Sequence, residues 1–371
     1  SIDPIKQQIS RMTLDEKLGQ LMIVGIEGYD LDENAKKMIQ EHRVGGIILY
    51  KKNVKNAEQL LALINSIKKA NEKCIPLFIS VDEEGGIVSR MPNEIKRLPS
   101  ARVIGKKNDE KLAYDVGAVI AQQIKAFGFN MDFAPVLDIN SNPRNPVIGD
   151  RAFGTEQEIV SRIGIATMKG IQSNGVISVV KHFPGHGDTS VDSHIGLPVL
   201  DNDLNRLQNF ELIPFKHAIE NNVDAVMVAH ILLTGLDKES PATMSKIIIT
   251  DILKKEMDFQ GVIITDDMTM GAIMENFEIG DAAVKSFVAG ADIILVAHEN
   301  DNQIRVLEAL KKAVEDGIIT KSRIDESVYK ILKLKRKYNL NNDLIDSVEV
   351  KQVNDSIEKV LSKYGLIQDK I

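Results

Sequence analysis

The chain has 371 residues, of which 43% are hydrophobic and 27% charged, a composition typical of a globular protein with a large buried core. Its formal net charge of −7, without a long basic run, argues against a nucleic-acid partner. The single cysteine, Cys74, excludes an intrachain disulfide and a cysteine-based zinc site, and no uninterrupted apolar run reaches the roughly 20 residues that span a bilayer.

Short apolar runs, each bounded by Gly, Asn or Asp, predict eight β-strands. In chain order they cover 18–26, 44–50, 76–81, 130–138, 176–181, 225–230, 262–265 and 292–296. Amphipathic segments between them predict helices, among them 56–70, 109–127, 155–173, 203–220 and 280–289. The strands are almost continuously hydrophobic, as is typical of parallel strands covered on both faces. Strand and helix alternating eight times predict an α/β fold, the closed (β/α)8 TIM barrel.

A doubly wound open sheet is the competing fold. It usually has a glycine-rich phosphate turn after the first strand, and residues 24–28 (VGIEG) do not match that fingerprint. From about residue 321 the sequence is lysine-rich and helical in pattern, at 322–338 and 347–364. We therefore predict a barrel domain over 1–342 and a C-terminal helical extension over 343–371 that packs against it.

Ionisable residues follow the predicted strands where the apolar runs stop. In chain order they are Asp82, Glu83, Glu84, Asp138, Lys181, His182, His230, Asp266, Asp267 and His298. Barrel enzymes place their chemistry at the carboxyl ends of the strands. One such residue alone is ordinarily a surface charge, but so many together indicate an active site.

Asp266 directly follows the apolar run 261–265, so the strand is expected to hold its side chain rigidly at the barrel mouth. Hydrolysis of a glycosidic bond needs one group that attacks or stabilises the anomeric carbon and another that protonates the leaving oxygen. Asp266 suits the first role. Its neighbour Asp267 is expected to point the opposite way, because side chains alternate along a strand, and to cap the following helix.

The segment 181–194 holds three of the seven histidines of the chain. Within it, His194 suits the proton-transfer role, because imidazole ordinarily titrates near neutral pH. Asp192, two positions earlier, can fix its tautomer and stabilise its protonated form. The alternative is that Asp192 and His194 merely close a loop turn.

A metal site is another interpretation of the same segment. His182 and His186 have the i, i+4 spacing of a helical zinc pair, and His194 could complete a cluster. Pro184 and two neighbouring glycines argue against a helix here. We therefore expect neither a metal nor another cofactor.

Several motifs resemble the signatures of glycoside hydrolase family 3, specifically its bacterial β-N-acetylhexosaminidase branch. They read MTLDEKLGQ at 12–20, DEEGG at 82–86 followed by Arg90, GDRAFG at 149–154, KHFPGHGDT at 181–189 followed by DSH at 192–194, and TDDM at 265–268. Their order is that of the family, and they span nearly the whole predicted barrel. The chain departs from the family at Glu83, where glutamine is usual, and at Ile87, where arginine is common.

The resemblance implies a retaining enzyme that removes terminal β-linked N-acetylglucosamine from cell-wall fragments (muropeptides) or chitin oligosaccharides through a covalent glycosyl-aspartate intermediate. It implies Asp266 as the nucleophile and His194 as the acid/base, oriented by Asp192. The positions that match sugar-binding residues are Asp82, Arg90, Arg151, Lys181 and His182. It also implies an active site complete within the barrel, without the second α/β domain of longer members. We expect the glycine-containing loop 185–194 to swing His194 over the bound sugar.

Two other functions fit the same residues. A histidine acid/base is neutral after it has donated its proton and repels phosphate less than a carboxylate does, so phosphorolysis of N-acetylglucosaminides is one alternative. A non-catalytic sugar-binding barrel is the other. The expected partner is a small carbohydrate that contains N-acetylglucosamine, with no nucleic acid, no membrane span and no predicted oligomeric state. The polar amino terminus favours a cytoplasmic protein over a secreted one whose signal was removed. The family resemblance further implies a role in peptidoglycan recycling.

Overall fold

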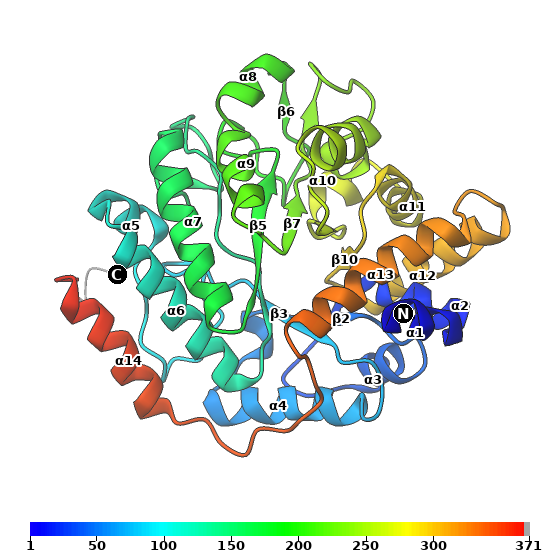
Figure 1. The fold of residues 1–371 in the computed structure, drawn as a ribbon, viewed down its shortest axis with the longest axis horizontal. Coiled ribbons are helices and arrows are strands. Elements are labelled where there is room, and N and C mark those ends of the chain that lie inside the picture. The colour runs from blue at the N-terminus through cyan, green and yellow to red at the C-terminus, as the bar shows by residue number, and fades with distance from the viewer. Residues whose placement is uncertain (367–371) are drawn as a thin grey trace.

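Parallel strands form the centre of the molecule in the computed structural model, which describes residues 1–366 (Figure 1). Within these residues, one eight-stranded parallel sheet has the order β10-β1-β2-β3-β4-β5-β7-β9. Its strands are β1 (Met22–Gly25), β2 (Gly46–Leu49), β3 (Phe78–Val81), β4 (Met131–Asp132), β5 (Ile177–Phe183), β7 (Ala225–Val228), β9 (Val262–Thr265) and β10 (Ile294–Val296). A parallel bridge between Ile264 and Ile293 joins the two edges, so the sheet closes into the predicted (β/α)8 barrel.

Helices surround this sheet, as the crossover connections between parallel strands require. In chain order they are α1 (Pro4–Arg11), α2 (Leu14–Gln20), α3 (Glu33–Gln40), α4 (Ala57–Ala70), α5 (Ala101–Lys107), α6 (Glu110–Phe127), α7 (Gln157–Ser173), α8 (Leu204–Asn209), α9 (Ile213–Glu220), α10 (Gly271–Met274), α11 (Ile279–Ala289), α12 (Asn300–Glu315), α13 (Lys321–Lys337) and α14 (Val350–Lys363). A π-helical segment covers Ile247–Glu256, and a small second sheet pairs β6 (Val199–Leu200) with β8 (Leu232–Leu233). Within residues 1–366, no helix combines the length and apolar composition needed to cross a membrane.

Each predicted apolar run overlaps one observed strand, and two runs are much longer than their strands. Residues 18–20 belong to α2 instead of β1, because Thr13 and Glu16 start that helix with a capping box. The run 130–138 is reduced to β4, because Pro135 has no N–H to donate to a strand ladder.

The prediction of one helix over 203–220 is wrong. The structure has α8 and α9 there, separated by residues 210–212. Pro214 lies in the first turn of α9, where its fixed backbone angle is tolerated, but inside one continuous helix it would remove a hydrogen bond and clash with the preceding turn.

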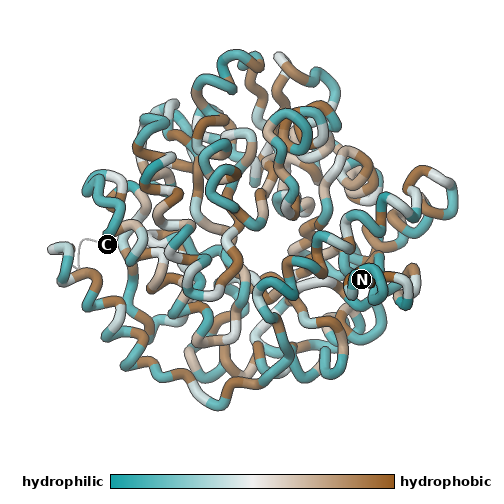
Figure 2. The backbone as a smooth tube through the Cα atoms, in the orientation of Figure 1, coloured by the Kyte–Doolittle hydropathy of each residue, from teal (hydrophilic) through white to brown (hydrophobic). Residues whose placement is uncertain are grey.

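Two glycines let α6 and α7 approach closely. A Cβ atom on Gly117 would lie 2.2 Å from the carbonyl oxygen of Thr167, and one on Gly170 would lie 2.1 Å from that of Tyr114. Alanine at either position would push the helices apart. Figure 2 shows hydrophobic residues along the central strands and alternating hydrophobic and hydrophilic stretches along the surrounding helices, as their amphipathic sequences predict.

The side chain of Lys335, on α13, closes the amino-terminal end of the barrel. Its Nζ donates to Oε1 of Gln20 and to the carbonyl oxygen of Gly45, both at 2.8 Å. It also lies 4.7 Å from the centre of the Phe78 ring. Burial lowers the pKa of Lys335 well below its ordinary value. Helix α13 is thereby tied to the segments that lead into β1 and β2 and to the start of β3.

Both ends of the described chain pack on the outer helices. The Tyr329 hydroxyl of α13 donates to the Asp3 carboxylate at the start of α1 (2.6 Å). Helix α14 lies beside α6 (Figure 1), and the Tyr364 hydroxyl donates to Asp115 of α6 (2.6 Å). The last part of the predicted extension, residues 367–371, lies outside the described residues.

Candidate active site

The carboxyl ends of the strands surround a cavity of about 360 Å³. Seven residues predicted from the sequence line it: Asp82, Arg90, Arg151, Lys181, His182, His194 and Asp266. The eighth, Asp192, contacts the cavity through His194, to which it is hydrogen-bonded. The fold therefore brings together side chains from segments far apart in the sequence.

Asp266 follows the last residue of β9. Its backbone N–H donates to the carbonyl oxygen of Val228 on β7 (2.9 Å), and its Oδ1 accepts from the Asp267 N–H (2.8 Å). Burial raises the pKa of Asp266, but the nearby rings of His182 and His230 outweigh it and hold the pKa below its ordinary value. Asp266 is therefore a carboxylate at neutral pH, the form that a nucleophile needs.

The prediction that Asp267 caps the next helix is wrong. The N-cap of α10 is Met270, which makes no side-chain capping bond. Instead, Oδ1 of Asp267 accepts from the N–H groups of Thr269 (3.0 Å) and Ala297 (2.9 Å). Both Asp266 and Asp267 line the cavity, because β9 ends at Thr265 and strand alternation does not continue past it.

Four charged side chains form an ion network on one wall of the cavity. Nζ of Lys181 lies 2.9 Å from Asp82 and 2.7 Å from Glu84, and both carboxylate oxygens of Glu84 accept from the Arg151 guanidinium at 2.8 Å. Burial raises the pKa of Glu84, but Arg151 and Lys181 outweigh it and hold the pKa far below its ordinary value. The network therefore stays charged and fixes the direction of its donors.

His182 is held beside this network by a buried carboxylate. Its Nδ1–H donates to Oδ2 of Asp138 (2.7 Å), and Oδ1 of Asp138 accepts from the backbone N–H groups of His182 (3.2 Å) and His186 (2.8 Å). In its neutral form the ring therefore presents Nε2 as an acceptor. We call Asp82, Glu84, Arg151, Lys181 and His182 the charged edge.

Glu84 has no individual role predicted from the sequence. Side chains two positions apart in an extended segment share a face, so the prediction for Asp82 could have been extended to Glu84. Its partner Arg151, however, is distant in the sequence, and only the folded barrel shows that the two side chains form a bidentate pair.

Arg90 is positioned by Glu83, one of the two departures from the family pattern. Oε1 of Glu83 accepts from the Arg90 backbone N–H (2.8 Å), and the Glu83 N–H donates to Asp132 (2.9 Å). Burial raises the pKa of Glu83 to about 7. The other departure, Ile87, is exposed to solvent and does not line the cavity.

Tyr50 and His298 form a further part of the cavity wall. His298 is one of the ionisable residues predicted at strand ends, whereas Tyr50 has no role predicted from the sequence. Their rings lie 5.1 Å apart, and the Arg90 guanidinium lies 5.8 Å from the centre of the Tyr50 ring. Tyr50 follows β2 directly, so an aromatic residue at a strand end was the available signal.

The acid/base loop, which we define as residues 185–196, carries the predicted proton donor. Oδ1 of Asp192 accepts from Nδ1 of His194 (2.8 Å) and from its backbone N–H (2.9 Å). Burial raises the pKa of Asp192, but these two hydrogen bonds outweigh it and the pKa is lowered. The pairing places a proton on Nδ1 of His194 and leaves Nε2 to exchange one with a ligand. The His194 side chain is 61% exposed.

His230 is a buried ring that supports the nucleophile segment. Its Nε2–H donates to the carbonyl oxygen of Asp267 (2.8 Å), and Nδ1 lies 2.9 Å from the Thr243 hydroxyl. Burial lowers the pKa of His230, which keeps the ring neutral. The sequence placed His230 at a strand end, but its partners are visible only in the fold.

Each histidine of segment 181–194 forms hydrogen bonds with different residues. His182 binds Asp138, His194 binds Asp192, and His186 lies between the Thr189 and Ser193 hydroxyls. Among residues 1–366, no group of three or more His, Cys, Asp or Glu side chains is arranged to hold a metal ion.

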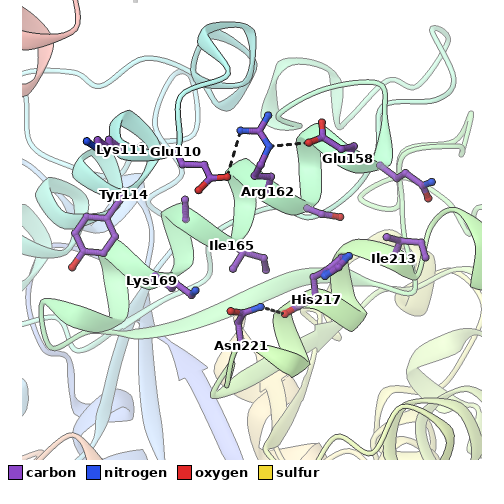
Figure 3. A pocket seen from close by; sticks show the side chains of 13 residues that line it. Glu110, Lys111, Tyr114, Glu158, Arg162, Ile165, Lys169, Ile213, His217 and Asn221 are labelled. Carbon is purple, nitrogen blue, oxygen red and sulfur yellow. Dashed lines mark hydrogen bonds and ion pairs between the residues drawn. The ribbon is translucent and has the colours of Figure 1, made fainter.

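A larger hollow, of about 720 Å³, lies on the outside of the helical layer between α6, α7 and α9 (Figure 3). Arg162 there pairs with Glu110 (3.6 Å) and Glu158 (2.8 Å), and the Asn221 amide donates to the carbonyl oxygen of His217. No predicted site residue lines this hollow. Because barrel chemistry belongs to the carboxyl ends of the strands, the smaller cavity is the candidate active site.

Comparison with known proteins shows which family this chain resembles. A family model described as the glycosyl hydrolase family 3 N-terminal domain matches residues 13–334. A β-hexosaminidase A from Pseudoalteromonas piscicida is 36% identical over 332 residues, which are 83% of this chain and 56% of that relative. A β-hexosaminidase from Nitrosomonas eutropha is 33% identical over 326 residues, which are 85% of this chain and 92% of that relative. The chain thus spans little more than half the length of the first relative.

A solved structure leads to the same family. The glycoside hydrolase family 3 β-N-acetylglucosaminidase from Paenibacillus sp. str. FPU-7 superposes with a TM-score of 0.89. Its sequence is 39% identical, and the match covers 95% of this chain and 69% of that one. The sequence motifs and the barrel fold therefore indicate the same family.

Proposed function

Because this chain belongs to glycosyl hydrolase family 3, we propose that it is a retaining exo-β-N-acetylglucosaminidase acting on cell-wall or chitin-derived oligosaccharides. One observation carries the proposal. Asp266 and His194 line the same cavity, and Asp192 orients the His194 ring. A carboxylate and a proton carrier facing one bound sugar are the two groups that glycoside hydrolysis requires.

The charged edge is the proposed binding site for the terminal sugar. Carboxylate oxygens of Asp82 accept hydrogen bonds from sugar hydroxyls, while Lys181 and Arg151 donate to hydroxyl or acetamido oxygens. Nε2 of His182 accepts from a further hydroxyl. Because the network is fixed before the sugar arrives, little reorganisation accompanies binding.

In the first step, a carboxylate oxygen of Asp266 attacks the anomeric carbon and the glycosidic C–O bond breaks. The leaving oxygen takes a proton from Nε2 of His194, whose positive charge the Asp192 carboxylate stabilises until then. The product is a covalent glycosyl-aspartate and a free aglycone alcohol.

In the second step, water attacks the anomeric carbon and gives its proton to Nε2 of His194. The bond to Asp266 breaks and the carboxylate is regenerated. Each displacement inverts the anomeric carbon, so the free sugar leaves in the β configuration with which it entered.

The test compares turnover of an aryl β-N-acetylglucosaminide, an aryl β-glucoside and N-acetylglucosamine-containing disaccharides from chitin and from peptidoglycan. We expect the N-acetylglucosaminides to be cleaved at least about tenfold faster than the glucoside, since buried polar groups left without the acetamido partner are costly. Proton NMR should show β-N-acetylglucosamine as the first product.

Two results would overturn the proposal. Sugar 1-phosphate formed in phosphate buffer identifies a phosphorylase. Binding of the disaccharide without turnover identifies a sugar-binding barrel, with the Asp266→Asn variant as the inactive reference.

A further inference from the structure

Two backbone hydrogen bonds dock the acid/base loop onto the segment that follows the nucleophile. The N–H of Gly271 donates to the carbonyl oxygen of His194 (3.1 Å), and the N–H of Ala272 donates to that of Ser193 (3.0 Å). Gly271 begins α10, shortly after Asp266 in the sequence. The loop that carries the proton donor therefore rests directly on the nucleophile segment.

This contact requires glycine at position 271. A Cβ atom there would lie 2.5 Å from the carbonyl oxygen of His194 and 2.7 Å from that of Ile195, well inside van der Waals contact. Backbone atoms cannot rotate away as a long side chain can. Alanine at this position therefore displaces the His194 backbone from its docked place.

His186 holds the loop from its other side. It is buried, its Nδ1 lies 2.7 Å from the Thr189 hydroxyl, and its Nε2 lies 3.1 Å from the Ser193 hydroxyl. The Thr189 hydroxyl donates its only proton to the His186 carbonyl oxygen, so it accepts from Nδ1–H. Nε2 then accepts from the Ser193 hydroxyl.

The backbone of His186 is tied to the charged edge. The His186 backbone N–H donates to Asp138, the carboxylate that also orients His182. Burial lowers the pKa of His186 to about 4, so the ring stays neutral and keeps this hydrogen-bond pattern above pH 5. Ser193 is thus held on one side by His186 and on the other by Ala272.

We propose that Gly271 and His186 are positioning residues that clamp the Ser193–His194 segment. The clamp places His194 beside the leaving oxygen while Asp266 faces the anomeric carbon of the same sugar. The proposal rests on the function proposed above for His194. Asp192 fixes the His194 ring only relative to its own loop, because both residues belong to that loop. The clamp fixes the loop relative to the nucleophile, although His194 and its neighbour Ile195 are exposed.

The experiment uses Gly271→Ala, with Gly196→Ala as a matched control. Gly196 lies in the same loop, and the nearest atom to its added Cβ is a Val191 methyl group at 3.6 Å, an ordinary contact. Values of kcat/KM are measured for a disaccharide, whose leaving group needs protonation, and for an activated aryl N-acetylglucosaminide, whose leaving group does not.

For Gly271→Ala we expect a loss of about 100-fold on the disaccharide and less than about threefold on the aryl substrate, the size of effect seen when a catalytic group is misplaced by about 1 Å. The alkaline limb of the disaccharide pH profile, which follows loss of the His194 proton, should also move. Gly196→Ala, whose added Cβ makes only an ordinary contact, should show a much smaller loss on the disaccharide than Gly271→Ala. Ser193→Ala, which removes one clamp hydrogen bond, should show the same selectivity with a loss of about tenfold.

Equal losses on both substrates, or no loss on either, would show that the clamp does not position His194. If Gly271→Ala does not fold, as judged by thermal unfolding, the Ser193→Ala result decides. Failure of the wild-type enzyme to cleave either N-acetylglucosaminide would overturn the proposed function instead, so the two failures are distinguishable.

Discussion

The charged edge and the acid/base loop differ sharply in how they are held. The side chains of Lys181 and Glu84 are 2% and 4% exposed, and each has two or more charged or hydrogen-bonded partners. The side chain of His194 is 61% exposed, and it is hydrogen-bonded to Asp192. The edge is therefore organised by burial and ion pairing, and the His194 end of the loop by backbone contacts and neutral hydrogen bonds.

This difference matches the two tasks. A sugar is bound best by donors and acceptors that are oriented beforehand, and a buried ion network keeps them so. A proton carrier must deliver a proton to the aglycone side and then take one from water, so it has to reach solvent. Substitutions in the edge should harm all substrates alike, and substitutions in the loop should discriminate by leaving group.

Asp266→Asn should have the largest effect. The amide keeps the acceptor for the Asp267 N–H but removes the attacking carboxylate, so we expect kcat/KM to fall by about 10⁴-fold or more on every substrate. Steady-state assays on aryl and disaccharide substrates check this. Residual activity within tenfold of wild type would place the nucleophile elsewhere.

His194→Ala should separate the substrates. We expect a loss of about 10²- to 10⁴-fold in kcat/KM on a disaccharide and a much smaller loss on an activated aryl substrate, because general acid catalysis matters only for poor leaving groups. Added azide, which attacks without a base, should restore kcat on the aryl substrate. A uniform loss would assign His194 to sugar binding and would remove the contrast between loop and edge.

Glu84→Gln should act uniformly. The substitution weakens the bidentate pair with Arg151 and removes one of the two carboxylates that pair with Lys181. We therefore expect kcat/KM to fall about 10- to 100-fold on both substrates, mainly because KM rises. Urea unfolding should show a loss of about 3 kcal/mol. The matched control is Glu158→Gln, which breaks an exposed pair with Arg162 and should change stability by less than about 0.5 kcal/mol. Selectivity by leaving group would contradict the assigned role of the edge.

Glu83→Gln should have the smallest effect on activity and a pH-dependent effect on stability. Because burial raises the folded-state pKa from 4.5 to about 7, the stabilising contribution of Glu83 is complete below pH 4.5 and is lost as the pH rises through 7. Glutamine stays neutral, so the variant should be the more stable protein at pH 8, by up to about 3 kcal/mol at about 1.4 kcal/mol per pKa unit. Urea unfolding of both proteins at pH 4 and pH 8 measures this difference in stability.

Asp132 supplies the control for this measurement. Burial also raises the pKa of Asp132, whose carboxylate accepts from the Glu83 N–H, and this group keeps titrating in Glu83→Gln. The prediction therefore concerns the difference between the two proteins. An equal stability difference at both pH values would mean that Glu83 is already ionised in the fold.

Much of this architecture could be predicted from the sequence, because apolar runs mark buried parallel strands and their ends mark the barrel mouth. Asp266 and Lys181 are recognisable in this way, each standing where a hydrophobic run stops. The role of Asp267 was missed, because its bond to Ala297 depends on how β9 and β10 lie side by side. The contact between Gly271 and His194 was likewise invisible, since nothing in either local sequence refers to the other.

The contacts of Lys335 can form only late in the synthesis of the chain. Its ammonium group joins Gln20 and Gly45, so the base of the first strands is completed by a residue synthesised near the end of the chain. Strand β1 also pairs with β10, which is equally late. During synthesis, therefore, β1 cannot pair with β10, and Gln20 and Gly45 cannot bind Lys335, until these late segments have left the ribosome.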